Sequence, residues 1–328
     1  MTRSSVGRPH LSFFAELADA ELDQLLTPAV LSTLRRRGAG LAVGLLDLSD
    51  RRAATLARAQ QAGVSITAWL LLDEADGYWL TLDNAAAARK RWLETRGWIE
   101  RFRLQIRTVG LDIEVPHHRA VGLVQRPVAT SIELVQQRRS AAHHAQAQED
   151  YAQLIQEIRQ VGMEVETYQI PLLADERRAG TTILQRASGI VDVQGDREVL
   201  MLYHSAVPKP MAAGLIHAYG RDAQAIAVGI TGGGVRSLQA EFADRELDLA
   251  ALRRELTSAA LYSDRLYVFS LEGCVRRGML EAICAEDLRS PAPLALALDH
   301  LAAKGTRVAL QTLMKLETAV HAVRRWRR

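Results

Sequence analysis

The order of eight short apolar or β-branched runs, nearly all separated by helical segments, is the feature that most constrains the fold of this chain. We expect strands at residues 11–17, 40–46, 64–72, 108–115, 163–172, 198–207, 225–231 and 265–272. Strands that alternate with helices form right-handed crossovers and a parallel sheet. The pattern therefore predicts an α/β protein, a closed (β/α)8 (TIM) barrel.

A doubly wound open sheet is the competing architecture. Such sheets usually carry a Gly-x-Gly-x-x-Gly turn after the first strand, whereas here residues 15–18 contain no glycine. Within the barrel, Ser49 is expected to cap a helix that Gly63 stops. We expect one long or broken helix at 128–160, and a short hairpin partner at 189–193 before the sixth strand.

The C-terminal segment exceeds what the eighth helix of a barrel needs. We therefore divide the chain into a barrel at residues 1–290 and a helical extension at 291–328. Apolar residues at helical spacing would pack the extension on the outside of the barrel.

Composition narrows the function classes. With 48% hydrophobic and 24% charged residues, the chain belongs to the ordinary globular class. Its net charge is +3, and the arginines lie among acidic neighbours rather than in one stripe, so we expect no nucleic-acid partner. Residues 1–9 do not resemble a secretory signal, and no later run is long enough to span a membrane, so we expect a cytoplasmic protein.

Acidic residues dominate the carboxyl ends of the expected strands, where barrel enzymes place their chemistry. Asp112 and Glu114 share one face of the fourth strand, because side chains alternate along a strand. Glu16 closes the first strand and Glu272 the eighth. Paired carboxyls are the groups that cleave glycosidic bonds, one as proton donor and one ionised. We therefore name Asp112, Glu114, Glu16 and Glu272 as candidate catalytic residues.

Other acids in similar positions have a structural interpretation. Asp47, Asp73 and Glu74 follow strands where the next helix begins, and a helix N-terminus favours negative charge. We expect these three to stabilise helices.

Two short motifs resemble the family 18 chitinase-like glycoside hydrolases. Residues 109–114, Val-Gly-Leu-Asp-Ile-Glu, resemble that family's fourth-strand signature Asp-Gly-x-Asp-x-Asp-x-Glu. Gly110 and Asp112 match it, Glu114 stands at its last aspartate, and Pro116 stands where the family has its catalytic glutamate. The resemblance implies a barrel with a carbohydrate pocket.

The sixth expected strand supplies the second motif. Met201 and Tyr203 match the family's Met-x-Tyr-Asp, and His204 replaces the aspartate. We include Tyr203 and His204 among the candidate substrate-binding residues.

Aromatic residues cluster around the third strand. Tyr78 and Trp79 lie in a connection and could stack on a sugar ring, whereas the helical spacing of Trp92 and Trp98 indicates packing against the barrel. The full set of candidate substrate-binding residues is Trp69, Tyr78, Trp79, Tyr168, Tyr203, His204 and Thr231.

Other chemistries receive less support. Thr231 precedes three glycines, which could cradle a phosphate or form a flexible turn. His117 and His118 lack metal-ligand spacing relative to Asp112 and Glu114, so we expect no metal and no cofactor. The four lysines leave only Lys209 near a strand end, which argues against Schiff-base chemistry.

The leading hypothesis is a glycoside hydrolase-like enzyme for a carbohydrate or glycoconjugate. Glu114 would donate the proton, Asp112 would be its electrostatic partner, and Glu16 or Glu272 would be the second carboxylate. One alternative is a barrel that has lost catalysis and serves as a binding or assembly module. Another is a metal- or phosphate-dependent enzyme that uses Asp112, His204 and residues 231–234.

Overall fold

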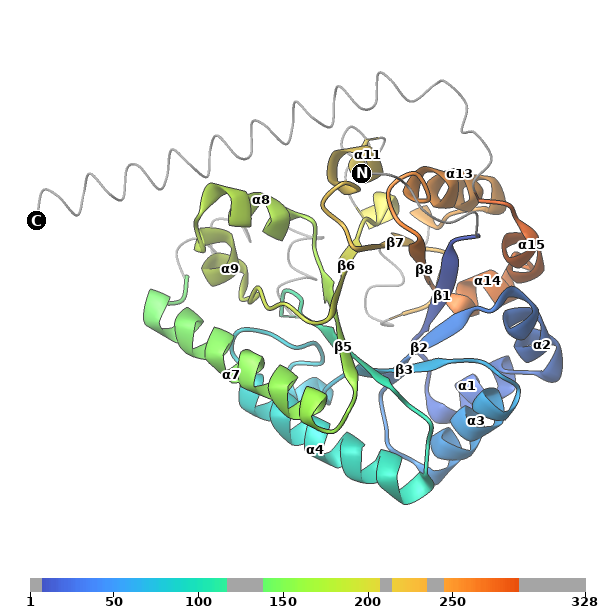
Figure 1. Ribbon diagram of the computed structural model, residues 1–328, viewed down its shortest axis with the longest axis horizontal. Coiled ribbons are helices and arrows are strands. Elements are labelled where there is room, and N and C mark those ends of the chain that lie inside the picture. Colours follow the sequence, from blue (N-terminus) through green and yellow to red (C-terminus); the bar gives the residue numbers. More distant parts are fainter. Residues whose placement is uncertain (1–7, 117–137, 207–213, 235–244, 289–328) are drawn as a thin grey trace, which may run out of the picture.

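The structure is a computed structural model that describes residues 8–116, 138–206, 214–234 and 245–288. Eight parallel strands close into a barrel in chain order, and helices surround it (Figure 1). This confirms the (β/α)8 prediction and excludes the open sheet. The strands are β1 (His10–Ala15), β2 (Gly40–Leu45), β3 (Ile66–Leu70), β4 (Thr108–Asp112), β5 (Glu164–Gln169), β6 (Arg197–Met201), β7 (Ala225–Gly229) and β8 (Arg265–Phe269).

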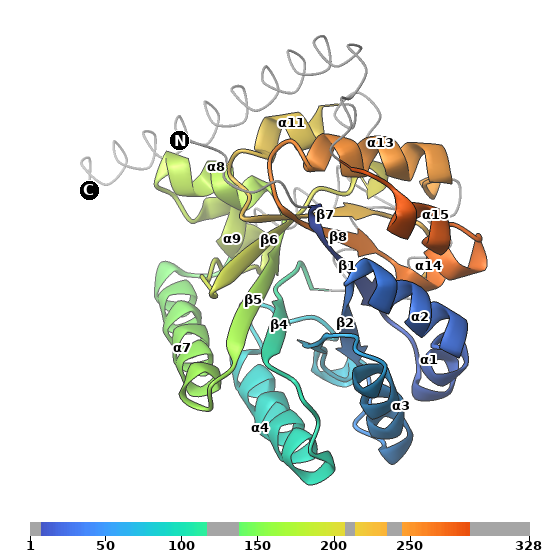
Figure 2. The same ribbon diagram turned by 45° about the vertical axis from the view of Figure 1, so that its right-hand side comes forward.

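The long helices α3, α4 and α7 lie on the outside of the barrel beside the strands that they connect (Figure 2). Ser49 caps α3 by accepting a hydrogen bond from the Arg52 N–H (3.1 Å), and Gly63 follows its end with φ 87°, as expected. The described helices are α1 (Asp19–Leu25), α2 (Pro28–Arg37), α3 (Asp50–Gln61), α4 (Ala85–Phe102), α7 (Ala141–Gln160), α8 (Leu172–Ala179), α9 (Ile183–Ser188), α11 (Leu215–Tyr219), α13 (Leu249–Ala259), α14 (Leu271–Arg276) and α15 (Leu280–Ala285), with 3-10 turns η1 (Glu74–Asp76) and η2 (His204–Ala206).

Alternation along the strands produces two separate apolar clusters. Odd-numbered residues of β1, such as Leu11 and Phe13, pack outward against the helices, whereas Phe14 packs inside the barrel. The interior is filled mainly by aromatic rings, with Phe14 5.3 Å from Trp69 and 4.9 Å from Tyr168, measured between ring centroids. Because this layer fills the middle of the barrel, it separates a floor at the amino ends of the strands from a mouth at their carboxyl ends.

One local prediction was wrong. Residues 189–193 form no hairpin strand, because β6 pairs with β5 on one edge and β7 on the other and so has no free edge. Between β1 and β2 the chain forms two helices, α1 and α2, because Pro28 starts α2 and disfavours helical geometry at Thr27 before it.

Some predictions concern residues that the structure does not describe, and others concern the helices around the barrel. Residues 128–137 and the extension at 291–328 lie outside the described residues, whereas α7 accounts for most of the long helix expected at 128–160. Trp92 and Trp98 are buried on α4, as their spacing indicated. In the described parts of the chain, no helix is both long enough and apolar enough to cross a membrane.

Candidate active site

The four candidate catalytic carboxyls converge at the mouth of the barrel. Asp112 ends β4 and is 3% exposed, Glu16 follows β1 and is 5% exposed, and Glu272 in the first turn of α14 is 1% exposed. Glu114 is the most accessible of the four and is partly exposed. The charges of Glu114 and Glu272 act on Glu16, and those of Glu114 and Glu16 act on Asp112, so the four acids form one group.

Burial shifts the titration of every member of this group. It raises the pKa of Glu114 to about 7 and that of Glu272 to about 7. Glu16 rises further, to a pKa of about 8, because the charges of Glu272 and Glu114 add to its burial while its hydrogen bond from Tyr78 acts in the opposite direction. Burial, followed by repulsion from Glu114 and Glu16, raises the pKa of Asp112 well above its usual range.

No described arginine, lysine or histidine forms an ion pair with Glu16, Asp112, Glu114 or Glu272. The nearby Arg52 is fully buried and pairs instead with Asp47 (2.6 Å), which holds the pKa of Asp47 down at about 2 against the effect of burial. This pairing agrees with the structural interpretation of Asp47.

Three polar atoms at or beside the mouth have no hydrogen-bond partner among the described residues. They are Asp112 Oδ1, Glu272 Oε2 and the indole Nε1 of Trp69, and all three are buried. The Trp69 indole lies close enough to Asp112 to lower the pKa of that carboxyl, against the larger effects of burial and repulsion. Buried polar atoms without partners are uncommon in folded proteins and call for an explanation.

The connection after β3 brings Tyr78 over Glu16. The Tyr78 hydroxyl donates a short hydrogen bond to Glu16 Oε1, and Tyr78 adopts a left-handed backbone conformation with φ 65°. Asn84 holds this connection by donating from Nδ2 to the carbonyls of Asp76 and Trp79, each at 2.9 Å. Strained residues held in this way cluster at functional sites. The structure brings Tyr78, a predicted binding residue, into contact with the candidate catalytic residue Glu16.

The glycine run after β7 packs against two of the acids. A Cβ atom on Gly233 would lie 2.4 Å from Glu272 Oε1, and one on Gly234 would lie 3.2 Å from Glu16 Oε2. The Gly234 N–H donates to Glu272 Oε1 at 3.3 Å. The run thus lets the backbone approach carboxylates, which is a poor setting for a phosphate.

Tyr203 and His204 face different neighbours. Burial, and then the charges of Asp112, Glu114 and Glu16, raises the pKa of the Tyr203 hydroxyl, so this ring lies at the mouth. His204 instead places Nδ1 2.6 Å from Glu255 of α13, and that carboxylate raises the pKa of His204. The structure therefore joins Tyr203, but not His204, to the acids.

The four other predicted binding residues are engaged in packing or in hydrogen bonds within the fold. Trp69 is 3% exposed in the aromatic packing, and Tyr168 donates to Glu166 (3.2 Å) at the floor. The Thr231 hydroxyl is used by the backbone of Ser270, donating to its carbonyl (3.0 Å) and accepting from its N–H (2.9 Å). Trp79 is buried beside Tyr78, with ring centroids 5.6 Å apart.

Phe269 was not among the predicted site residues. Its ring lies 5.9 Å from Tyr203 and 6.5 Å from Trp69, and a Cβ on Gly234 would approach it to 2.7 Å. Phe269 therefore borders the same site. The signal was its place at the end of β8, in alternation with the inward-facing Tyr267.

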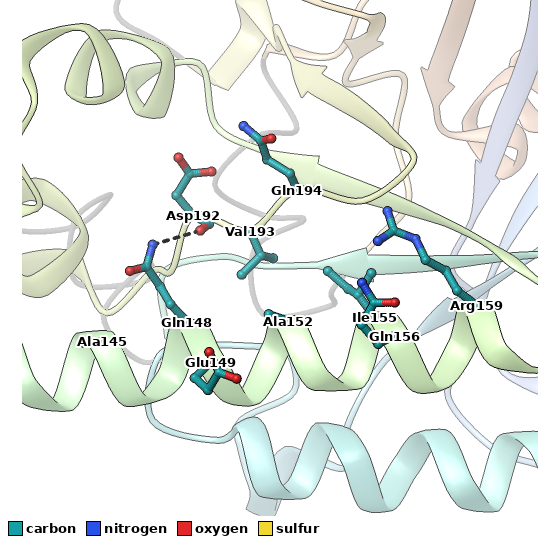
Figure 3. A pocket seen from close by; sticks show the side chains of 10 residues that line it. All are labelled: Ala145, Gln148, Glu149, Ala152, Ile155, Gln156, Arg159, Asp192, Val193 and Gln194. Carbon is teal, nitrogen blue, oxygen red and sulfur yellow. Dashed lines mark hydrogen bonds between the residues drawn. The ribbon is translucent and has the colours of Figure 1, made fainter.

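A separate groove of about 490 Å³ lies outside the barrel, between α7 and residues 192–194 (Figure 3). Gln148 Nε2 donates to the Asp192 carbonyl across it at 3.3 Å. It contains none of the predicted site residues. Across the described residues, no group of three or more His, Cys, Asp or Glu is arranged to hold a metal, and His117 and His118 lie outside them.

No protein-family model and no curated protein sequence matches the chain. Solved structures do match it in fold. The glycoside hydrolase domain of PgaB (BpsB) from Bordetella bronchiseptica matches with a TM-score of 0.50 and 9% identity, over 87% of this chain and 100% of that one.

Two further matches are weaker. A GH18 chitinase from Pseudoalteromonas aurantia has a TM-score of 0.46 and 8% identity, over 84% of this chain and 98% of that one. An L-ribulose 3-epimerase has a TM-score of 0.43 and 14% identity, over 95% and 97%. The match to the glycoside hydrolase domain of PgaB (BpsB) confirms the remote resemblance to glycoside hydrolase barrels at the level of the fold.

Proposed function

We propose that this protein is a glycoside hydrolase-like enzyme that cleaves a carbohydrate or glycoconjugate at the mouth of its barrel. The observation that supports this proposal most strongly is a group of four carboxyls that no described basic residue neutralises. Its members are Glu16, Asp112, Glu114 and Glu272. The fold shared with a glycoside hydrolase domain supports the same reaction class.

Glu114 is the best candidate for the proton donor. A general acid must hold a proton near neutral pH and reach the leaving oxygen. Burial raises the pKa of Glu114 to about 7, and its partial exposure distinguishes it from the three deeper acids. Pro116, at the position where the family 18 resemblance expects the catalytic glutamate, has no proton to give, and Glu114 lies two residues before it in the chain.

The other acids act on the charge that develops on the sugar. Cleavage passes through an oxocarbenium-like transition state, which an ionised carboxylate stabilises. Asp112 is the electrostatic partner of Glu114, and Glu16 or Glu272 is the second carboxylate. Glu272 accepts from the Gly234 N–H, which favours its ionised form.

Replacing Glu114 tests the proposal directly. Glu114→Gln keeps the shape of the side chain but removes the transferable proton. We expect turnover of a 4-nitrophenyl glycoside that the wild type cleaves to fall by about 10²–10⁴, at pH 6, with little change in substrate affinity. A panel of such glycosides, differing in the sugar, provides the substrate.

The matched control is Glu149→Gln on the exposed face of α7, which should keep the wild-type rate. An unchanged rate in Glu114→Gln would contradict the assignment of the proton donor. If the wild type cleaved no glycoside but bound saccharides, the alternative of a binding module would be favoured.

A further inference from the structure

The mouth holds more acidic groups than bond cleavage requires. A glycosidase uses one pair of carboxyls, and Asp112, Glu114, Glu16 and Glu272 make twice that number. Their shared site costs free energy whenever they ionise together, because like charges repel in a medium of low polarity. A positively charged ligand group among these carboxyls would offset the free energy cost of ionising them together.

The buried polar atoms without hydrogen-bond partners indicate what kind of positive group would fit. Asp112 Oδ1 and Glu272 Oε2 are buried acceptors without a described partner, and an ammonium offers three donors and no acceptor. The Trp69 N–H lies beside Asp112 and acts on that carboxyl as a hydrogen-bond donor does, yet it makes no hydrogen bond of normal geometry, so it is also a donor for a hydroxyl or ether oxygen. The ligand would therefore combine a cation with sugar oxygens.

Aromatic rings supply a further attraction for a cation. Tyr203 lies among the carboxylates, its ring 5.9 Å from that of Phe269, and Tyr78 donates to Glu16. The faces of aromatic rings attract cations, and more strongly where water is excluded.

Two described arginines that reach backbone carbonyls near the carboxyl ends of the strands already have other partners. Arg52 binds Asp47 and the carbonyls of Gly44 and Leu17, and Arg91 donates to the carbonyls of Leu71 and Leu45. Both lie at the carboxyl ends of the strands without forming an ion pair with the mouth acids.

We propose that the ligand of this site is a saccharide with a free protonated amine, held by the acids that do not donate the proton. The saccharide part of this inference rests on the proposed function, whereas the amine part rests on the surplus carboxyls and the open acceptors. Glu272, with its open Oε2, is the acid expected to contribute most to binding the amine.

The experiment is calorimetric titration of the full chain with three tetrasaccharides of one β-1,4-linked backbone. They carry at the sugar 2-position an amine (glucosamine), a hydroxyl (glucose) or an acetamide (N-acetylglucosamine). At pH 6.5 and low salt we expect the amine to bind about 10- to 100-fold more tightly than the hydroxyl, as charge-assisted hydrogen bonds allow. Glu114→Gln protein replaces the wild type for any sugar that is cleaved.

Variants separate a specific site from general attraction. Glu272→Gln should lower the ratio of the affinity for the amine sugar to the affinity for the hydroxyl sugar by at least about tenfold. Glu149→Gln, a matched loss of one exposed carboxylate, should keep the full preference. Equal affinities for the three sugars, no binding of the amine sugar, or a preference untouched by Glu272→Gln would overturn the inference.

The same material distinguishes this inference from the proposed function. Cleavage that depends on Glu114, without a preference for the amine, contradicts only the amine site. Selective binding of the amine sugar, with no cleavage that depends on Glu114, supports the amine site and contradicts hydrolysis.

Discussion

The floor and the mouth of this barrel both bury carboxylates in the lumen, and they treat them in opposite ways. At the floor, Glu166 is 2% exposed and is fully partnered by Arg197 (2.5 Å), Tyr267 (2.6 Å) and Tyr168 (3.2 Å). At the mouth, the acids have no described cation. A buried charge that is paired serves the structure, whereas buried acids without a counterion lower stability and require another explanation.

A residue of β5 separates the floor from the mouth. Glu166 and Tyr168 share the inward face of β5, and Tyr168 lies against Gly110 of β4, where a Cβ would approach its hydroxyl to 2.4 Å. The ring therefore occupies the space between the floor charge and Asp112. Packing by Phe14, Trp69 and Tyr168 keeps the floor arginine away from the mouth acids.

The largest expected effect comes from breaking the floor pair. Arg197→Gln leaves Glu166 buried without its cation and should lower the free energy of unfolding by about 3–5 kcal/mol, measured by urea denaturation at pH 7. Glu164→Gln, which removes only the 3.8 Å contact of Arg197 to an exposed carboxylate, should change it by less than about 0.5 kcal/mol. A loss below about 1 kcal/mol in Arg197→Gln would show that the floor needs no counterion.

A smaller effect, of opposite sign, is expected at the mouth. The pKa of Glu16 is raised from 4.5 to about 8, so the folded state holds a proton that the unfolded state releases. Stability therefore falls as pH rises from about 4.5 to 8. Glu16→Gln should be more stable than the wild type by about 1–3 kcal/mol at pH 8, and equally stable at pH 4.

Thermal and urea unfolding at the two pH values measure this difference. Glu149→Gln provides the control, because an exposed carboxylate should leave the pH dependence of stability unchanged. If Glu16→Gln were less stable than the wild type at pH 8, the ionised Glu16 of the wild type would have to be paired with a cation. The contrast with the floor would then fail.

The barrel and the position of the acids at one end of it could be predicted from the sequence, because both follow from the alternation of short parallel strands with helices and of side chains along each strand. Asp112 ends β4 and Glu114 follows it two residues later, and residues after β1 and β8 reach the same end of a closed barrel. The resemblance to family 18 motifs identified the same strand ends, although Pro116 departs from it.

The sequence did not reveal the partners of these side chains. His204 and Tyr203 are adjacent, yet one meets Glu255 on α13 and the other faces the mouth, because the chain leaves β6 through a 3-10 turn. The glycines at 232–234 are compatible in sequence with a phosphate cradle or a flexible turn, and neither interpretation indicates their contacts with Glu272 and Glu16. Such contacts depend on residues far apart in the chain, which local patterns do not encode.

The smallest expected effect is a shift in a pH profile. Asp112 and Glu114 repel each other, so the pair releases its last proton at a higher pH than Glu114 would alone. Asp112→Asn removes that repulsion, and the alkaline limb of kcat/KM should move to lower pH by about 1 unit. The direction of the movement carries the test, because general damage to the mouth would lower the rate at every pH without moving the limb. A limb that stayed in place, or moved to higher pH, would show that the charge of Asp112 does not raise the pKa of Glu114. The acids of the mouth would then not act on one another, and the contrast with the paired floor carboxylate would lose its basis.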